Sequence, residues 1–295
     1  MSKTSDTIRT EWAKGDAKRD EGLTTPPEIE RFDNLVYGDD DVCQKLDVYR
    51  PKADRGLRLP VIVSVHGGAW VYGDKELYQF YCMNLALRGF AVVNFTYRLA
   101  PEWKFPASLQ DTVLVVEWIK KHAEEYDMDA DNVFMVGDSA GAHILGLFCN
   151  LCTNPAYASR FDFAAPKDFA PRAVALNCGK YTFRKTSDDD QTEDPELLSD
   201  FLPHGGAEDD FDLVEVADYV TSDFPPAFVM TCYNDFLKYQ APHLCDRLIK
   251  AVVPFSFNMY GDSKDPLYHV FHVNIRTEAA EKCNDDECAF FAKNL

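Results

Sequence analysis

The hydrophobic residues of this chain follow two periods, one typical of strands and one of helices, which alternate along most of its length. The β-branched run 61–65, interrupted only by Ser64, is typical of a strand buried on both faces of a sheet. The expected strands lie at about 45–50, 61–65, 90–96, 131–137, 172–178, 226–232 and 255–260, and the expected helices at about 75–88, 107–124, 140–152, 239–250 and 276–293.

This alternation predicts an α/β fold with a mostly parallel central sheet flanked by helices. Two segments depart from it. Residues 1–35 are polar and begin with a weakly amphipathic helix, and residues 180–223 are acidic, with the run 187–190 as an example. We expect cap elements from both segments, forming a small helical lid. Because the chain has no internal repeat or low-complexity linker, residues 1–295 are expected to form a single domain.

The composition excludes several partners. The 30 basic and 49 acidic residues give a net charge of −19, which should repel nucleic acid and anionic membranes. No apolar run is long enough to span a bilayer, and the polar N-terminal segment lacks a signal-like apolar core, which predicts a cytoplasmic protein. The nine cysteines are scattered, as buried free thiols of a reducing compartment are. We expect no metal and no cofactor.

One stretch carries a recognisable catalytic pattern. Residues 137–141 read Gly-Asp-Ser-Ala-Gly, directly after an expected strand and before an expected helix. This is the context of the G-x-S-x-G nucleophile elbow, in which a tight turn exposes the serine at the carboxyl end of a strand. Ser139 is therefore the candidate nucleophile.

A serine nucleophile needs oxyanion donors, a base and an acid that orients the base. The donors are expected from Gly67 and Gly68, directly after the strand 61–65, and from Ala140 after the nucleophile. His66, just before the two glycines, is expected to brace their loop.

The base should follow the last strand, where His269 and His272 lie. The acid should follow the preceding strand, which favours Asp235 over Asp262 and Asp265.

These motifs together resemble the hormone-sensitive-lipase-like esterases. The resemblance rests on 66–70 (His-Gly-Gly-Ala-Trp), 97–102 (Tyr-Arg-Leu-Ala-Pro-Glu), Pro106 with Asp111, and the stretch 137–141, and it covers about residues 45–275. It implies an α/β-hydrolase fold with a helical cap, hydrolysis of short-chain carboxylic esters, no metal, and a homodimer as one expectation. It also implies a triad of Ser139, Asp235 and His269, although Val270 replaces a glycine that commonly follows this histidine.

Two other functions stay open. An arylformamidase-like amide hydrolase would use the same triad, because its sites share the H-G-G-x-W loop and the S-A-G-A-H run at 139–143. A non-catalytic ligand-binding module on this fold is a third reading. The aromatic residues Trp70 and Tyr72 follow the expected oxyanion loop, and we expect them to shape a pocket for a small-molecule ester substrate.

Overall fold

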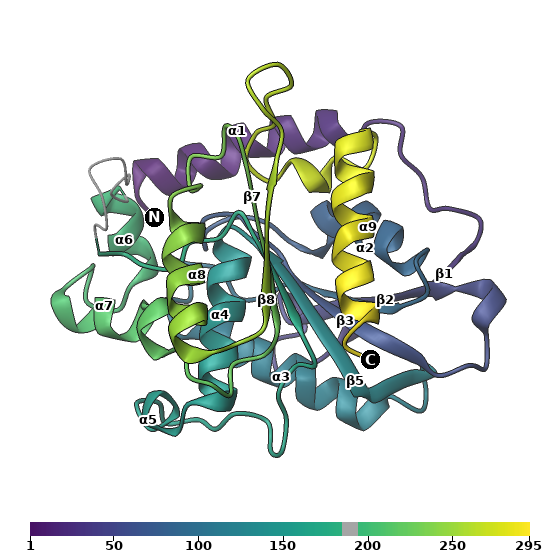
Figure 1. Ribbon diagram of the computed structural model, residues 1–295, viewed down its shortest axis with the longest axis horizontal. Coiled ribbons are helices and arrows are strands. Elements are labelled where there is room, and N and C mark those ends of the chain that lie inside the picture. Colours follow the sequence, from purple (N-terminus) through teal and green to yellow (C-terminus); the bar gives the residue numbers. More distant parts are fainter. Residues whose placement is uncertain (185–193) are drawn as a thin grey trace.

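The computed structural model describes residues 1–184 and 194–295, so the acidic run 187–190 lies outside the described residues. One sheet of eight strands runs through the molecule in the order β1-β2-β4-β3-β5-β6-β7-β8 (Figure 1). The strands are β1 (Ile29–Val36), β2 (Lys45–Pro51), β3 (Leu59–Val65), β4 (Ala91–Phe95), β5 (Met128–Asp138), β6 (Val174–Asn177), β7 (Ala227–Cys232) and β8 (Phe255–Tyr260). The pairs β1–β2 and β2–β4 are antiparallel, and every other pair is parallel.

The helices follow the strands in the order that the sequence predicts. They are α1 (Lys3–Asp20), α2 (Lys75–Ala86), α3 (Ala107–His122), α4 (Ala140–Thr153), α5 (Pro155–Ala158), α6 (Pro195–Phe201), α7 (Glu208–Val214), α8 (Gln240–Ala251) and α9 (Glu278–Ala292), with short 3-10 turns at Lys52–Asp54, Ala217–Tyr219 and Phe271–Val273. The predicted α/β fold with a mostly parallel, helix-flanked sheet is confirmed.

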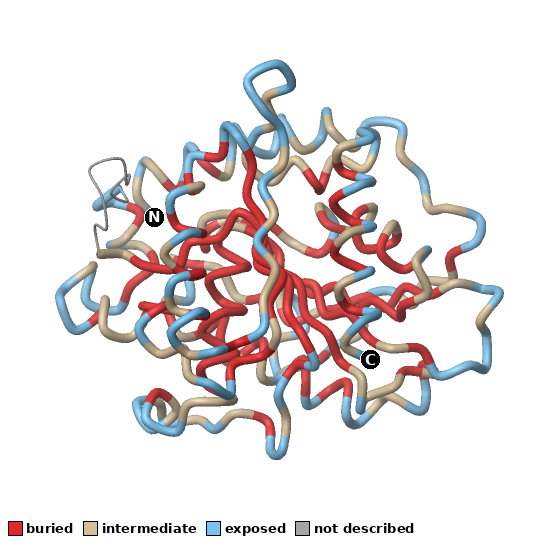
Figure 2. Tube along the Cα trace, in the orientation of Figure 1, coloured by how far each residue is buried: buried red, intermediate tan, exposed pale blue. Residues whose placement is uncertain are grey.

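Two hydrophobic layers hold the helices against the sheet, and Figure 2 shows the buried strands running through the centre. Val61 and Val63 point into the layer shared with α3, α4 and α8, whereas Ile62 points into the layer shared with α2 and α9. Because successive strand residues face opposite sides, both faces of β3 must be apolar. This explains the nearly unbroken β-branched run.

Strand β1 is an element that the hydrophobic pattern did not predict. It pairs with β2 at the edge of the sheet, and its register shifts between Phe32 and Leu35. At this irregularity Asn34 has a φ of 60°, and its N–H donates to Asp47 Oδ1 at 2.7 Å. A half-exposed edge strand with a bulge lacks the period-2 signal on which the prediction depends.

Helix α1 lies across the carboxyl end of the sheet, and its N-terminus meets α6 (Figure 1). Ser2 N–H donates to Asp200 Oδ2 at 2.8 Å, and Thr4 N–H donates to Glu196 Oε2 at 3.1 Å. Further along, Arg9 pairs with Glu102 at 2.6 Å. Segments far apart in sequence are therefore joined above the strand ends.

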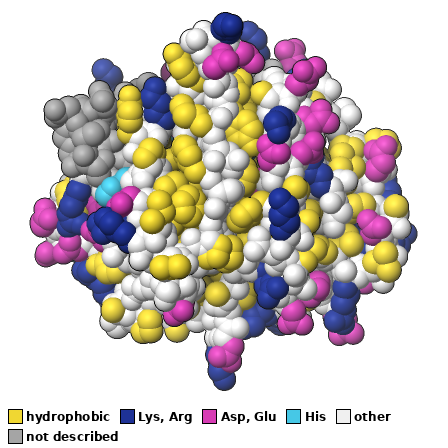
Figure 3. Space-filling model, in the orientation of Figure 1, with side chains coloured by type: hydrophobic (Ala, Val, Ile, Leu, Met, Phe, Trp, Pro, Cys, Tyr) yellow, Lys and Arg dark blue, Asp and Glu magenta, His cyan; other side chains and the backbone are white. Residues whose placement is uncertain are grey.

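The surface mixes charges of both signs, as Figure 3 shows for one face, with hydrophobic side chains gathered over β8 and its neighbours. On β8, Phe257 and Met259 are exposed. Among the helices of residues 1–184 and 194–295, none is both long and apolar enough to cross a bilayer.

Gly141 offers a test of how closely α4 packs on β3. A Cβ at this position would lie 2.0 Å from Val65 O and 2.5 Å from His66 O, so the helix would have to move away from the strand. We expect Gly141→Ala to lower the free energy of unfolding by about 3 kcal/mol in urea denaturation. Gly15→Ala is the control, because a Cβ there meets nothing within 4 Å. A Gly141→Ala variant as stable as the wild type would contradict this packing.

Candidate active site

Ser139 occupies a sharp bend between β5 and α4. Its φ of 52° and ψ of −118° are unusual for a residue with a side chain. Its N–H donates to Asn177 O at 2.9 Å, which ties the bend to the end of β6. A Cβ on Gly137 would lie 2.6 Å from Gly141 O, so the two glycines are needed where the chain crosses itself. The predicted strand–turn–helix context of Ser139 is therefore present.

Asp235 and His269 are brought together by the ends of β7 and β8. His269 Nδ1 lies 2.6 Å from Asp235 Oδ1, although 34 residues separate the two along the chain. The carboxylate also accepts from Thr231 Oγ1 at 2.7 Å and from Leu237 N–H at 2.9 Å. Burial alone would raise the pKa of Asp235, but these hydrogen bonds outweigh it, and the pKa lies below its usual value. Asp235 is therefore an ionised acceptor that fixes the orientation of the imidazole.

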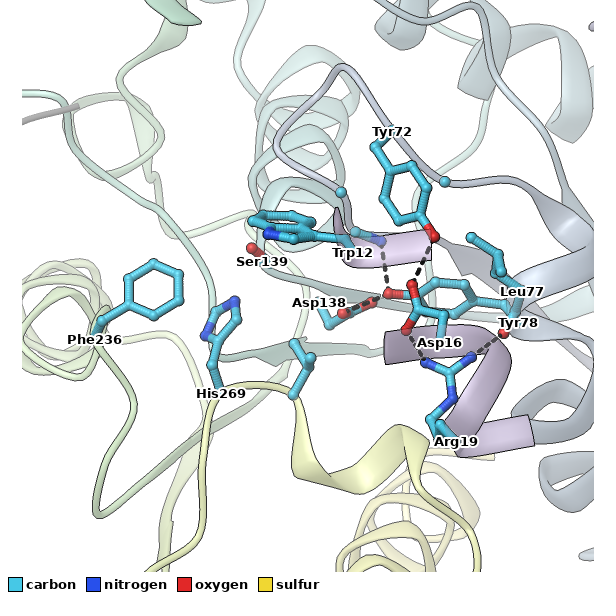
Figure 4. Close-up of a pocket in the computed structure, with 14 residues that line it drawn as sticks. Trp12, Asp16, Arg19, Tyr72, Leu77, Tyr78, Asp138, Ser139, Phe236 and His269 are labelled. Atoms are coloured by element: carbon cyan, nitrogen blue, oxygen red, sulfur yellow. Dashed lines mark hydrogen bonds and ion pairs between the residues drawn. The ribbon is translucent and has the colours of Figure 1, made fainter. Parts of the chain in front are cut away.

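The imidazole of His269 and the hydroxyl of Ser139 face the same cavity of about 350 Å³ (Figure 4). Within the described residues, no hydrogen bond yet joins them; such catalytic bonds often tighten only in the substrate complex. The ring of Phe236 packs beside His269, with centroids 4.2 Å apart. His272, the alternative base, is instead fully buried against Tyr81, and burial lowers its pKa to about 3. Of the two histidines, His269 is the one that lines the cavity of Ser139.

The glycine loop after β3 differs in one respect from the prediction. The N–H of Gly67 donates to the hydroxyl of Tyr78 at 3.0 Å, so it is already occupied. In the described part of the chain, the N–H groups of Gly68 and Ala69 have no hydrogen-bond partner. The expected role of Gly67 as an oxyanion donor stays a prediction, and it would require this N–H to leave the Tyr78 hydroxyl. The motif does not reveal that hydrogen bond, because the bond depends on how α2 packs beside the loop.

His66 supports this loop from below. Its Nδ1 lies 2.7 Å from Gly67 O, and its ring stacks on Tyr97 with centroids 4.0 Å apart. Burial lowers the pKa of His66 to about 4, so the ring is neutral at physiological pH. His66 thus braces the loop, as the sequence led us to expect, and burial keeps its ring neutral.

Two cavities meet at Ser139. The larger one is also lined by Gly68 and Tyr72, and the smaller one, of about 210 Å³, by Ala69, Trp70 and Ala140. Trp70 is nearly buried, stacks on Phe201 and donates to His143 Nδ1 at 3.1 Å. Both predicted substrate-contacting aromatics therefore reach the space around the serine, and Trp70 also packs in the core.

Helix α1 contributes residues that the sequence did not identify. Trp12 lines both cavities, and Asp16 and Arg19 line the larger one. Asp16 accepts from the Tyr72 hydroxyl at 2.7 Å and pairs with Arg19 at 2.8 Å (Figure 4). The available signal was weak: these residues recur at helical spacing on an otherwise polar segment.

Three side chains at this site lie close enough together to be considered as metal ligands. In the described part of the chain, Cys178, Asp235 and His269 place potential ligand atoms within 4.8 Å of one another. Burial strongly raises the pKa of the Cys178 thiol, which disfavours the thiolate that binds metals. Asp235 and His269 are already bonded to each other, so the geometry fits an acid–imidazole pair better than a ligand set.

A second buried carboxyl lies beneath the bend. Glu287 of α9 accepts from Asn177 Nδ2 at 2.7 Å and from the Tyr81 hydroxyl at 3.2 Å. Burial raises the pKa of Glu287 to about 7. Because Asn177 O also accepts from Ser139 N–H, this carboxyl belongs to the layer that supports the bend.

Sequence comparison relates this chain to esterases. The BD-FAE family model matches residues 46–241. Esterase LipQ of Mycobacterium tuberculosis is 28% identical over 230 residues, which cover 74% of this chain and 54% of LipQ. Ethyl acetate hydrolase of Pseudomonas putida is 33% identical over 122 residues, which cover 41% of this chain and 37% of that protein. The chain therefore spans about half, or less, of the length of these relatives.

Structural comparison gives the same fold over the whole chain. The structure of esterase B from Lactobacillus rhamnosis, inhibited by a C4-C4 SN3 tributyrin phosphonate, has a TM-score of 0.87 to this chain. The alignment covers 100% of this chain and 96% of that one, at 24% sequence identity. At this identity the likeness establishes the fold.

The pKa of Glu287 predicts a pH-dependent stability. The folded protein holds this proton more tightly than the unfolded chain, so stability is lost as the pH rises from about 4.5 to about 7. The Glu287→Gln side chain stays neutral at every pH, so this variant does not lose that stability. We therefore expect the unfolding free energy of Glu287→Gln minus that of the wild type to rise by about 3 kcal/mol from pH 5 to pH 8. Urea denaturation at both pH values measures this, with exposed Glu281→Gln as the control. A pH-independent difference at position 287 would contradict the assignment.

Proposed function

This chain belongs to the BD-FAE family, and from that premise we propose that it is a serine carboxylesterase that forms an acyl-enzyme on Ser139. The observation that carries the proposal is the 2.6 Å hydrogen bond between Asp235 and His269, whose ring lines the same cavity as Ser139. A nucleophile, an oriented base and backbone donors around the two cavities that meet at Ser139 are the parts that acyl transfer requires. The esterase names of the relatives LipQ and ethyl acetate hydrolase support the same reaction.

In the proposed mechanism, His269 Nε2 takes the proton of Ser139 while Oγ attacks the ester carbonyl. Asp235 stays ionised and stabilises the imidazolium, in keeping with its lowered pKa. The imidazolium then protonates the leaving alcohol. Water, deprotonated by His269, hydrolyses the acyl-enzyme and releases the acid.

The oxyanion of the tetrahedral intermediate would be held by the N–H groups of Gly68, Ala69 and Ala140. Gly68 and Ala140 keep the role that the motifs predict, and Ala69 replaces Gly67. The N–H of Ala140 is available because it lies in the first turn of α4, where backbone donors have no helical partner. The dipole of α4 adds to this stabilisation of negative charge.

The two cavities suggest how the ester lies. His269 lines the larger cavity, and it must reach the leaving oxygen, so the alcohol part would occupy this space. The acyl part would then enter the smaller cavity of about 210 Å³, which is bounded by Trp70 and Leu197. A space of this size favours short acyl chains.

We also propose that α1 and α6 form a cap on a single α/β-hydrolase domain. Thr4 and Ile8 of α1 and Leu197 of α6 line the smaller cavity, so both helices bound the space for the acyl group. The hydrogen bonds from residues 2 and 4 to α6 join the two halves of this cap.

Ser139→Ala tests the nucleophile. Turnover of p-nitrophenyl acetate should fall by about a million-fold, because the variant cannot form the acyl-enzyme. Circular dichroism and urea denaturation should show an intact fold. Activity that survives the substitution would refute the mechanism.

A parallel assay with N-formylkynurenine separates esterase from arylformamidase activity. If the protein turns over no ester or formamide in a Ser139-dependent way, a binding module is favoured.

A panel of p-nitrophenyl esters tests the acyl cavity. We expect kcat/KM to fall by about tenfold or more between butyrate and laurate. Leu197→Ala should shift the preference toward longer chains, because Leu197 lines the smaller cavity. Leu198→Ala is the matched control, because Leu198 lies on the same helix and also packs against the core but does not line this cavity. Equal shifts in both variants, or no chain-length preference in the wild type, would contradict the assignment of this cavity.

A further inference from the structure

Tyr78 of α2 joins the two loops on which the reaction depends. Its hydroxyl accepts from Gly67 N–H at 3.0 Å and donates to Asp138 Oδ2 at 2.7 Å (Figure 4). Gly67 begins the glycine loop after β3, and Asp138 is the residue immediately before Ser139. We propose that Tyr78 is a positioning residue that holds the oxyanion donors in register with the nucleophile, an inference that rests on the proposed esterase function.

The contacts around Gly67 show how closely these parts are fitted. A Cβ on Gly67 would lie 2.8 Å from Asp138 Oδ2, 3.0 Å from Asp138 O and 3.1 Å from the Tyr78 hydroxyl. The φ of Gly67 is not in the left-handed region, so contact rather than backbone conformation excludes a side chain here. The loop therefore rests directly on the carboxyl and the phenol.

The register of the sheet places the same two loops side by side. Strands β3 and β5 are parallel neighbours, with Val65 opposite Gly137 at their carboxyl ends. The glycine loop and the serine bend therefore leave the sheet together. However, the N–H of Ser139 donates to Asn177 at the end of β6, on the side of β5 away from β3. On the side toward β3, the hydrogen bonds of Tyr78 to Gly67 and Asp138 connect the glycine loop to the serine bend.

Burial makes this connection strong and directional. Asp138 is 2% exposed and Tyr78 is 8% exposed. Burial raises the pKa of Asp138 to about 6. Burial also raises the pKa of Tyr78 well above its usual value, so the phenol keeps its proton and remains a donor at neutral pH. Inside a protein, a hydrogen bond to a carboxylate is strong, and an unpaired buried partner is costly.

The consequence for catalysis follows from the position of Gly67 in the loop. Gly68 and Ala69, the next two residues, line the cavities at Ser139. Fixing the N–H of Gly67 on Tyr78 would therefore fix the direction of the two amides that follow it. Donors that are aligned before the reaction stabilise the transition state more than the bound ester. Losing the alignment should therefore lower kcat and leave KM nearly unchanged.

Tyr78→Phe tests this proposal, because it removes the hydroxyl and keeps the ring. We expect kcat for p-nitrophenyl acetate to fall by about a hundred-fold, with KM within about twofold of wild type. The matched control is Tyr49→Phe on β2. Tyr49 is also buried, its hydroxyl donates to a carboxyl, Asp47, at 2.7 Å, and it lines neither cavity at Ser139. We expect this control to lose stability and to retain kcat within about threefold.

A second pair of variants keeps the test informative if Tyr78→Phe folds poorly. Asp138→Asn preserves an oxygen that can accept from Tyr78, whereas Asp138→Leu does not. We expect the Asn variant to keep at least about a tenth of the wild-type kcat and the Leu variant to lose as much as Tyr78→Phe.

Several outcomes would overturn the proposal. They are a folded Tyr78→Phe variant with wild-type kcat, equal kcat losses in Tyr78→Phe and Tyr49→Phe, a loss confined to KM, or equal effects of Asn and Leu at position 138. Failure of the proposed esterase function is separate from all of these. It would appear as wild-type turnover that persists in Ser139→Ala, before Tyr78 is tested.

Discussion

The bend at Ser139 is the constraint on which the rest of the structure depends. A residue with a side chain is held at a φ of 52°, a conformation that costs on the order of 1–3 kcal/mol and persists only when its surroundings enforce it. Here the hydrogen bond to Asn177 O and the contact between Gly137 and Gly141 enforce it. The bend exposes the hydroxyl and leaves the first amides of α4 free. The cap, the acid–imidazole pair and the glycine loop are all arranged around the cavities that Ser139 lines.

Much of the fold could be predicted because the strand and helix periods are physically distinct. Strand β3 packs against apolar layers on both faces, so its residues are almost all apolar. That unbroken apolar run was enough to predict the position of the strand and a parallel sheet. The resemblance to the hormone-sensitive-lipase-like esterases, drawn from the motifs, is confirmed by the esterase relatives and the fold. Strand β1 was missed because an exposed edge strand with a bulge at Asn34 carries no clear period.

The candidate site was predictable only in part. Chain order after successive strands was enough to select Asp235, and the structure brings it to His269 rather than to His272. Sequence could not show that the N–H of Gly67 is directed at Tyr78, since that depends on how α2 packs beneath the loop. Nor could it show that Trp12, Asp16 and Arg19 of α1 line the cavity. Such contacts arise from tertiary docking, for which local patterns carry no signal.

The role of Ser139 is tested most directly by identifying the atom that becomes acylated. A short-chain p-nitrophenyl alkylphosphonate traps the nucleophile of a serine hydrolase as a stable adduct, which peptide mass spectrometry can locate. If Ser139 is the nucleophile, one phosphonyl group per chain attaches to the peptide that contains Ser139, and esterase activity is lost in proportion to labelling. Full inactivation with the label on another residue, or full activity in a protein labelled at Ser139, would contradict it.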